Sequence, residues 1–222
     1  MWCAARSARH RRLRLDGEVA DDDGIRVVPA GTDIWPDVVK VFGTRGYPSW
    51  CWCQYFLTTG GGYTHAGDQN REALHDQLDD PAVRCGDELA GLLAYRGDEP
   101  VGWLQLGPRT RFPRVTGNHR LATVLSAAAD EPGPIWRVTC FVVRVGHRRH
   151  GVARALLAGA VDRAREQGAT VLEGHPVDPA VRGATVSSAD LYHGVFSMFV
   201  AAGFVEVGRT APSRPVVRLA LR

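Results

Sequence analysis

Residues 138–167 read VTCFVVRVGHRRHGVARALLAGAVDRAREQ, and this stretch decides the fold. Its first six residues, 138–143, are almost wholly apolar and rich in β-branched side chains, which is typical of a strand buried on both faces. Apolar residues then recur over 152–164 with the period of an amphipathic helix, and Gly168 follows where helices commonly end. The stretch predicts a strand that is joined to a helix by a short basic turn.

The basic turn is suited to an anion. The first N–H groups of a helix have no partner within the helix and lie at the positive end of its dipole. Gly151 has no Cβ and Ala153 is small, so a phosphate can approach the backbone closely. Arg148, Arg149 and His150 add positive charge. We therefore expect a phosphate or diphosphate ligand. A Walker loop is excluded because its Gly-Lys-Ser/Thr is missing, and a Rossmann dinucleotide site is disfavoured because no G-x-G-x-x-G follows a predicted strand.

The turn also carries a family resemblance. The run RRHGVA, residues 148–153, resembles the Arg/Gln-x-x-Gly-x-Gly/Ala signature for acyl-CoA in the GNAT superfamily of acetyltransferases, and FVVRV before it is similar to that family's fourth strand. The run YPSWCWCQYF, residues 47–56, resembles a block near the N-terminus of an uncharacterised actinobacterial branch of the family, and that similarity runs from about residue 25 to the end. The resemblance implies an α/β (α+β) GNAT fold, with a mixed, mostly antiparallel central sheet and helices on both faces. The alternative is an ordinary strand–helix turn in another α/β protein.

Composition limits the class of protein. The chain has 222 residues, 45% of them hydrophobic and 23% charged, which is typical of a soluble globular domain. A net charge of +3 does not argue for nucleic acid, and no apolar run approaches the ~20 residues that span a bilayer. The five cysteines are odd in number and lack the spacing of a metal site, so we expect reduced thiols, no metal and a cytoplasmic location.

The rest of the chain divides into a tail and one domain. Residues 1–24 carry a basic block followed by an acidic block and few apolar side chains, so we expect a disordered N-terminal tail and a single GNAT domain over residues 25–222. A long connection, 107–134, could cover the acceptor site or carry a contact in a homodimer. The predicted strands are 25–29, 91–95, 100–106, 169–173, 204–209 and 215–221, and the predicted helices are 37–42, 69–78, 121–129 and one through Leu191, Val195, Met198, Phe199 and Ala202 that ends at Gly203.

An aromatic block occupies residues 50–56, where four of seven side chains are aromatic. Read as a strand, it places Trp50 and Trp52 on one face and Tyr55 on the other. The block would either pack in the core or form a wall of the acceptor pocket. We name Trp50, Trp52 and Tyr55 as candidate substrate-binding residues.

The resemblance implies where acetyl-CoA (coenzyme A) would bind. The diphosphate would take backbone N–H groups from residues 149–154, the pantetheine arm would pair with the strand end, and the thioester carbonyl would take an N–H near residues 141–143. The candidate cofactor-binding residues are Phe141, Val142, Val143, Arg144, Val145, Arg148, Arg149, His150, Gly151, Val152, Ala153, Arg154 and Tyr192.

The resemblance also implies catalytic roles. Several members of the family carry a catalytic glutamate at the end of the fifth strand, which makes Glu173 the candidate base, with His175 second and Asp178 third; the alternatives are an ion-paired strand residue and a base that acts through ordered water. The family's acidic Tyr falls on Phe199, which has no hydroxyl. Tyr192 could replace it or simply bind the cofactor, or the thiolate could leave without an acid.

The resemblance therefore implies an enzyme, an N-acetyltransferase of the EC 2.3.1 class. It would move an acetyl group from acetyl-CoA to the amine of a small molecule by direct attack. Two alternatives stay open, namely an acetyltransferase of protein or peptide N-termini and a non-catalytic acyl-CoA-binding regulatory module.

Overall fold

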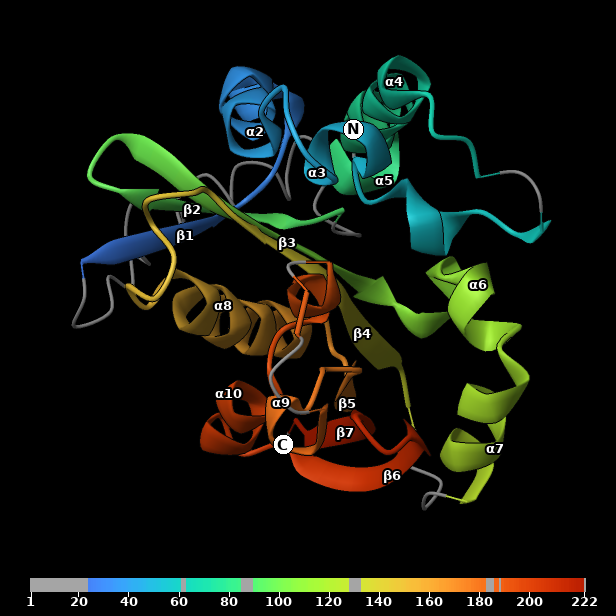
Figure 1. Cartoon of the computed structure of the whole chain (residues 1–222). Helices are drawn as coiled ribbons and strands as arrows, with labels where there is room; N and C mark the ends of the chain where they lie inside the picture. Colours follow the sequence, from blue (N-terminus) through green and yellow to red (C-terminus); the bar gives the residue numbers. More distant parts are fainter. Residues whose placement is uncertain are drawn as a thin grey trace.

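The computed structural model describes residues 24–60, 63–84, 90–127, 133–182, 186–187 and 189–221. They form a seven-stranded sheet with the order β1-β2-β3-β4-β5-β7-β6 (Figure 1). All neighbouring strands are antiparallel except β4 and β5, which are parallel. The strands are β1 (Ile25–Pro29), β2 (Leu92–Arg96), β3 (Glu99–Pro108), β4 (Ile135–Val143), β5 (Val171–Gly174), β6 (Val205–Ala211) and β7 (Arg214–Ala220). The sheet is therefore the mixed, mostly antiparallel one that was predicted.

Helices cover both faces of this sheet, as Figure 1 shows for α2 to α5 on one side of β1–β3 and α8 on the other. The predicted tail, residues 1–24, lies outside the described residues apart from Gly24. Among the described residues, no helix combines the length and hydropathy that a membrane-spanning segment needs. The α-helices are α2 (Trp35–Phe42), α3 (Pro48–Cys51), α4 (Gly67–Asp79), α5 (Pro81–Arg84), α6 (Pro113–Thr116), α7 (His119–Ala127), α8 (Val152–Glu166), α9 (Pro179–Arg182) and α10 (Phe196–Ala201), and the 3₁₀ helices are η1 (Thr32–Ile34), η2 (Gln54–Leu57), η4 (Arg109–Arg111) and η5 (Asp190–His193).

The alternation of side chains along β2 divides the core into two layers. Leu92 and Ala94 pack in the cluster beneath α8, whereas Leu93 and Tyr95 pack in the cluster beneath α2 and α4. α8 lies across β1, β2 and β3, and its first turn approaches β3 closely. A Cβ built on Gly102 of β3 would lie 2.6 Å from a methyl group of Val152. The glycine thus lets the start of α8 sit directly on the sheet, which fixes the position of the basic turn.

Strands β4 and β5 separate after a short paired segment. They pair only between Ile135–Arg137 and Val171–Glu173, and the remaining length of β4 pairs with β3 alone. The register between β3 and β4 shifts between Gln105 and Leu106, so Thr139 is the extra residue of a bulge. The parting opens the sheet next to the start of α8.

Two predicted elements were wrong. The aromatic block is not a strand, because it forms α3 and η2, and the two residues between them, Trp52 and Cys53, have φ of 43° and 57°. Pro48 occupies the first turn of α3, a position in which proline favours a helix. The predicted helix after Leu191 is broken at Gly194, whose φ of 74° separates η5 from α10.

The connection 107–134 supports the sheet and a loop. Phe112, which follows η4, forms a third apolar cluster with residues of α6, α7 and β7, and α7 packs against β6. Arg114 Nε donates to the carbonyl oxygens of Tyr55 at 2.7 Å and Thr58 at 3.0 Å. Its guanidinium also lies 4.3 Å from the centre of the Tyr55 ring. The connection therefore holds the segment after η2 in place, while its predicted roles in covering the acceptor site and in dimerisation stay predictions.

Candidate functional site

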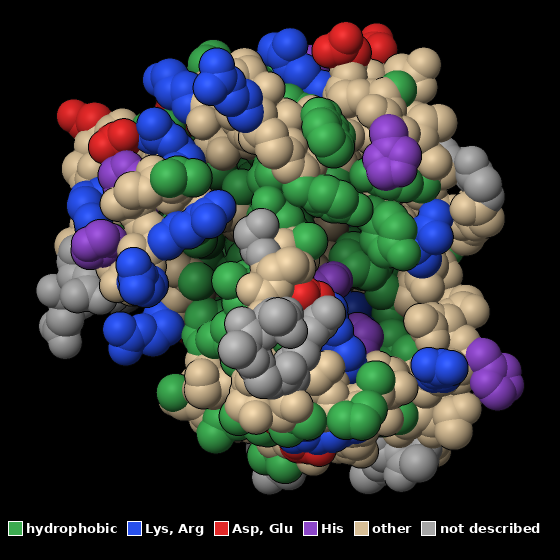
Figure 2. Space-filling view, in the orientation of Figure 1, with side chains coloured by type: hydrophobic (Ala, Val, Ile, Leu, Met, Phe, Trp, Pro, Cys, Tyr) green, Lys and Arg blue, Asp and Glu red, His purple; other side chains and the backbone are tan. Residues whose placement is uncertain are grey.

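A groove of about 490 Å³ lies where β4 and β5 part. One wall is the basic turn with the first residues of α8, and the other is the segment from η5 through α10. Figure 2 shows a hollow near the middle of the face drawn, largely lined by hydrophobic side chains and with Lys and Arg side chains on one side of it. Arg148, Arg149 and Arg154 line the groove, which makes it suitable for an anionic ligand with an apolar part.

The basic turn presents unpaired backbone N–H groups to this groove. Gly151 precedes α8 with φ of 80°, a left-handed conformation that favours glycine. The first hydrogen bond of the helix runs from the Ala155 N–H to the Gly151 carbonyl at 3.0 Å, so the N–H groups of residues 152–154 precede the helical ladder. These donors and the positive end of the dipole of a fifteen-residue helix suit a phosphate group.

The free edge of β4 presents a second set of backbone groups. The Arg144 N–H donates to the Val101 carbonyl of β3 at 3.0 Å. Because antiparallel pairing alternates along a strand, Val142 also faces β3, while the N–H and C=O of Phe141 and Val143 face the gap toward β5. An extended chain could pair with these groups in the groove.

Most of the predicted cofactor residues line the groove, and four do not. Val142 points to the other face of β4. Arg144 donates to Glu99 at 2.7 Å, Val145 is 82% exposed, and the His150 carbonyl accepts from Arg96. The predicted residues that line the groove are Phe141, Val143, Arg148, Arg149, Gly151, Val152, Ala153, Arg154 and Tyr192.

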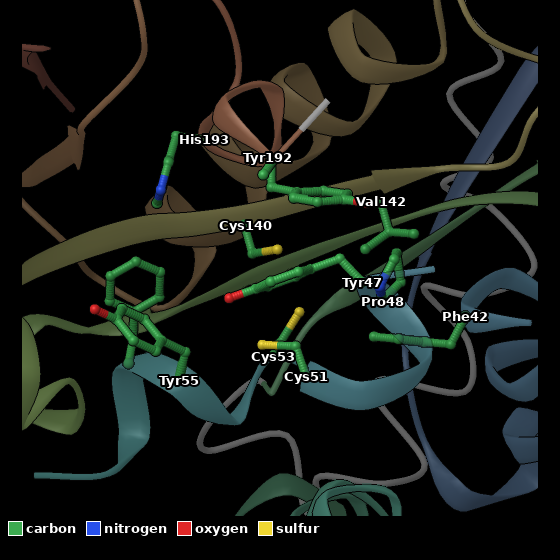
Figure 3. Close-up of a pocket in the computed structure, with 12 residues that line it drawn as sticks. Phe42, Tyr47, Pro48, Cys51, Cys53, Tyr55, Cys140, Val142, Tyr192 and His193 are labelled. Carbon is green, nitrogen blue, oxygen red and sulfur yellow. The ribbon is translucent and has the colours of Figure 1, made fainter. Parts of the chain in front are cut away.

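A second cavity, of about 220 Å³, lies on the opposite face of β4. Alternation along the strand turns Cys140 and Val142 into this cavity, whereas Phe141 and Val143 line the groove. Figure 3 shows the sulfur atoms of the cysteines and the rings of the tyrosines gathered around one space. Tyr192 lines both the cavity and the groove, so the two spaces meet at its side chain. The lining residues are Phe42, Tyr47, Pro48, Cys51, Cys53, Tyr55, Phe56, Cys140, Val142, Ala189, Tyr192 and His193.

A series of hydrogen bonds joins three walls of this cavity. The amide of Gln105, a buried residue of β3, donates to the Cys53 carbonyl at 3.0 Å, and its oxygen accepts from the Thr139 hydroxyl at 2.7 Å. The Thr139 carbonyl lies 3.2 Å from His193 Nδ1. A carbonyl can only accept, so Nδ1 carries the proton and Nε2 keeps its lone pair. These hydrogen bonds fix the left-handed Cys53, the bulge of β4 and the His193 imidazole relative to one another.

Burial shifts the pKa of four cavity groups, His193, Tyr192, Cys51 and Cys53, toward the uncharged form. Burial and the nearby Arg214 lower the pKa of His193 to about 4. Burial raises the pKa of the Tyr192 phenol and of the Cys51 and Cys53 thiols, so all three keep their protons. The Tyr192 ring is stacked on Tyr47 with 5.9 Å between ring centres. His193 can therefore accept a proton, and Tyr192 can donate one.

Glu173, the predicted base, is fully buried and lines neither space. Arg137 and Arg218 are its register partners on β4 and β7. The carboxylate accepts from Arg137 Nη2 at 2.5 Å, from Arg109 Nη1 at 3.1 Å and from Arg218 Nε at 3.0 Å. Both carboxylate oxygens are thus occupied by guanidinium groups and are turned away from both spaces. This geometry favours the alternative that Glu173 is an ion-paired strand residue over its predicted role as the catalytic base.

The two other candidate bases, His175 and Asp178, also lie outside the groove and the cavity. His175 lies 3.4 Å from the Thr210 hydroxyl and outside both lining sets, and burial lowers its pKa to about 3. Asp178 accepts from Arg209 at 2.9 Å. Phe199 is fully buried against Phe141 and Phe204. Only Tyr192 of the predicted catalytic set reaches the site.

The aromatic block contributes one of its three predicted substrate-binding residues. Tyr55 lines the second cavity, on the face of β4 opposite the groove. Trp50 is 52% exposed and does not line it. Trp52 is buried and stacks on Phe42 at 4.6 Å between ring centres. The strand reading failed here because the chain turns through two left-handed residues, which no alternation pattern reveals.

Several cavity residues had not been predicted. His193 comes from η5 and Tyr47 from the turn before α3, and they meet only in the folded chain. Gln105 of β3 does not line the cavity but holds Cys53, which does. One signal was present, since His193 adjoins the predicted Tyr192 and precedes Gly194. A Cβ on Gly194 would lie 3.1 Å from the Phe141 ring and closer still to Phe199 and Met198. This close packing, together with the positive φ, explains why a helical period was interrupted there.

Known proteins resemble this chain in sequence family and fold. The model of the Acetyltransferase (GNAT) family matches residues 49–183, more than half of the chain. The GNAT domain of S. lividans PAT is similar, with a TM-score of 0.53 and 20% identity over 92% of this chain and 96% of that one. The acetyltransferase of the GNAT family from Streptococcus pneumoniae has a TM-score of 0.47 and 12% identity, over 89% of this chain and 99% of that one. The PaiA N-acetyltransferase of Thermoplasma acidophilum, in complex with coenzyme A, has a TM-score of 0.43 and 11% identity, over 88% and 98%.

No curated protein matches the chain. The family match covers β2 to β5, and therefore both the parting of β4 from β5 and the basic turn before α8. The similarity to the S. lividans domain extends the same fold over nearly the whole chain. The chain belongs to the GNAT family of acetyltransferases.

Proposed function

We propose that the protein is an N-acetyltransferase that moves an acetyl group from acetyl-CoA to the amine of a small molecule by direct attack. The observation that supports this most is that a groove suited to an anionic, partly apolar ligand meets an apolar cavity at Tyr192. The two spaces lie on opposite faces of one strand end. A donor in the groove and an acceptor in the cavity would thus be held next to each other.

The residues of the groove fit acetyl-CoA. The N–H groups of residues 152–154, with Arg148, Arg149 and Arg154, suit the diphosphate, and the open edge of Phe141 and Val143 suits the pantetheine arm. When bound, acetyl-CoA supplies an activated acetyl group and a thiolate leaving group. An N–H at the edge of β4 would stabilise the charge that develops on the carbonyl oxygen.

Two side chains can move the protons of the reaction, His193 in the cavity and Tyr192 at the junction. His193 Nε2 has a free lone pair and can accept the proton that the amine loses. The Tyr192 hydroxyl keeps its proton at neutral pH and can give it to the departing thiolate. This assignment replaces Glu173 and His175, which do not reach the cavity, and it retains Tyr192 as the acid.

The same geometry bears on the alternative functions. A proton acceptor, His193, lies in the cavity and a proton donor, Tyr192, lies at the junction, which favours an enzyme over a non-catalytic acyl-CoA-binding module. The size of the cavity, about 220 Å³, favours a small acceptor over a peptide N-terminus. Dimerisation and a cytoplasmic location stay predictions.

Isothermal calorimetry with acetyl-CoA tests the proposal. Gly151→Val places a side chain over the exposed N–H groups and should weaken binding by at least about tenfold, which corresponds to 1.4 kcal/mol. Gly168→Val is the matched control, because Gly168 lies at the other end of α8 with φ of 73° and nothing within 4 Å of a built Cβ. Both glycines have a positive φ, so a valine is strained at either position. Equal affinity for acetyl-CoA in the two variants would overturn the assignment of the groove.

A further inference from the structure

We propose that the acceptor is a compact arylamine, an aromatic ring that carries an amino group uncharged at neutral pH. This inference rests on the proposed function and names its substrate class. It draws on three independent features of the acceptor cavity, namely its size and ring-lined walls, the absence of charge among its described lining residues, and the weakness of its base.

The size and walls of the cavity suit one aromatic ring. A dry protein cavity of about 150 Å³ holds benzene, so a cavity of about 220 Å³ has room for a ring, an amino group and a small substituent. Five aromatic side chains line it, and Tyr47, Tyr55 and Tyr192 are among them. Cysteine sulfur from Cys51, Cys53 and Cys140 also faces this space (Figure 3). Polarisable sulfur and ring faces make favourable contacts with an aromatic guest.

The charges around the cavity disfavour a cationic acceptor. None of the described residues that line it is an aspartate, glutamate, lysine or arginine. Arg214 lies near enough to lower the pKa of His193, although it is paired with Asp190 at 2.6 Å, and Arg148 acts on Tyr192 from the groove. An alkylammonium ion would lose its water here without gaining a carboxylate partner.

The available base also matches an arylamine. His193, with a pKa of about 4, cannot remove a proton from an alkylammonium ion, which is a far weaker acid than imidazolium. An arylamine nitrogen already has a free electron pair. As its N–C bond forms and the C–S bond breaks, the nitrogen becomes acidic enough for a weak base to take one proton. The sulfur gains one proton, so the products are an N-aryl acetamide and the free thiol of coenzyme A.

Two isomeric amines test this inference. 4-Ethylaniline and 2-phenylethylamine have the same formula and ring, but only the second is a cation at neutral pH. With acetyl-CoA saturating, we expect the rate of N-acetylation per micromolar amine, followed by chromatography, to be at least about 100-fold higher for 4-ethylaniline, which is 2.7 kcal/mol of discrimination. Cyclohexylamine tests whether an apolar cation suffices, and a short peptide tests the N-terminal alternative.

A pair of variants connects the preference to the cavity. Tyr55→Ala removes one ring from the wall and should raise the KM for 4-ethylaniline about 3- to 10-fold with unchanged acetyl-CoA affinity. Trp50→Ala is the matched control, because Trp50 is a nearby exposed ring outside the lining. Faster acetylation of 2-phenylethylamine, cyclohexylamine or the peptide would overturn the inference and leave the proposed function intact. Acetyl-CoA binding without transfer to 4-ethylaniline would overturn the inference alone, whereas a failure to bind acetyl-CoA would overturn the proposed function itself.

Discussion

Replacement of Glu173 by glutamine separates a structural role from a catalytic one. The substitution keeps the size of the side chain but removes the charge that three arginines share. It also turns one N–H₂ group toward guanidinium donors, and it leaves Arg137, which is 1% exposed, without a compensating charge. Loss of one partner of a buried ion pair costs about 3–5 kcal/mol of unfolding free energy.

For a chain of this size each kcal/mol lowers the melting temperature by roughly 2–4 °C, so we expect a decrease of about 6–20 °C. Glu166→Gln is the control, since Glu166 is 53% exposed and pairs with Arg163 on the surface of α8. It should cost less than about 1 kcal/mol. Calorimetric and urea unfolding of both variants measure the difference.

A double variant keeps the prediction testable if Glu173→Gln does not fold. Arg137→Met with Glu173→Leu replaces the most buried pair of the cluster by apolar side chains of similar size, which is often neutral in proteins. It should recover part of the loss, because Arg109 and Arg218 still lose the carboxylate. The result that would refute this reasoning is a Glu173→Gln protein with wild-type stability and acetyl-CoA affinity but greatly reduced turnover. Such a protein would restore Glu173 as the base.

Three further perturbations test the site. Gln105→Leu leaves two buried partners unsatisfied and should cost about 2–3 kcal/mol in urea unfolding, whereas an unchanged midpoint would remove the hydrogen-bond chain as a support of the cavity. Tyr192→Phe should lower kcat about 100-fold with little change in acetyl-CoA affinity, and an unaffected kcat would mean that the thiolate leaves without this acid. His193 and His175 have pKa values of about 4 and about 3, below the unfolded value of 6.5, so the unfolded chain binds more protons. Their contribution to the free energy of unfolding is complete above pH 6.5 and is lost as the pH falls toward 4 and then 3, by at most about 1.4 kcal/mol per pH unit for each histidine. In His193→Gln the free energy of unfolding, measured with urea, should depend less steeply on pH. A slope equal to that of the wild type would contradict these pKa values.

The sequence predicted the elements that local patterns determine. The hairpin of β2 and β3, the apolar strand β4, the basic turn and α8 were all expected, because period, turn chemistry and capping agree there. The groove followed from them, since its phosphate end is local to residues 148–154. The fold class was predicted from the family resemblance that the basic turn and its flanking elements carry.

The acceptor side could not be predicted in the same way. Glu173 meets Arg137 and Arg218 only because β5 lies between β4 and β7, and the order of strands in a sheet is not a local property of the sequence. Likewise, Cys53 and His193 come together through Gln105 of β3. A glutamate at a strand end therefore looked like a base, while the imidazole that faces the cavity went unnoticed.

A crystal structure with acetyl-CoA tests the central claim most directly. The account predicts that the diphosphate lies within hydrogen-bonding distance of the N–H groups of residues 152–154. It also predicts that the thioester lies next to Tyr192 between Phe141 and the acceptor cavity. A nucleotide bound anywhere else, or a thioester that does not reach the cavity, would contradict it.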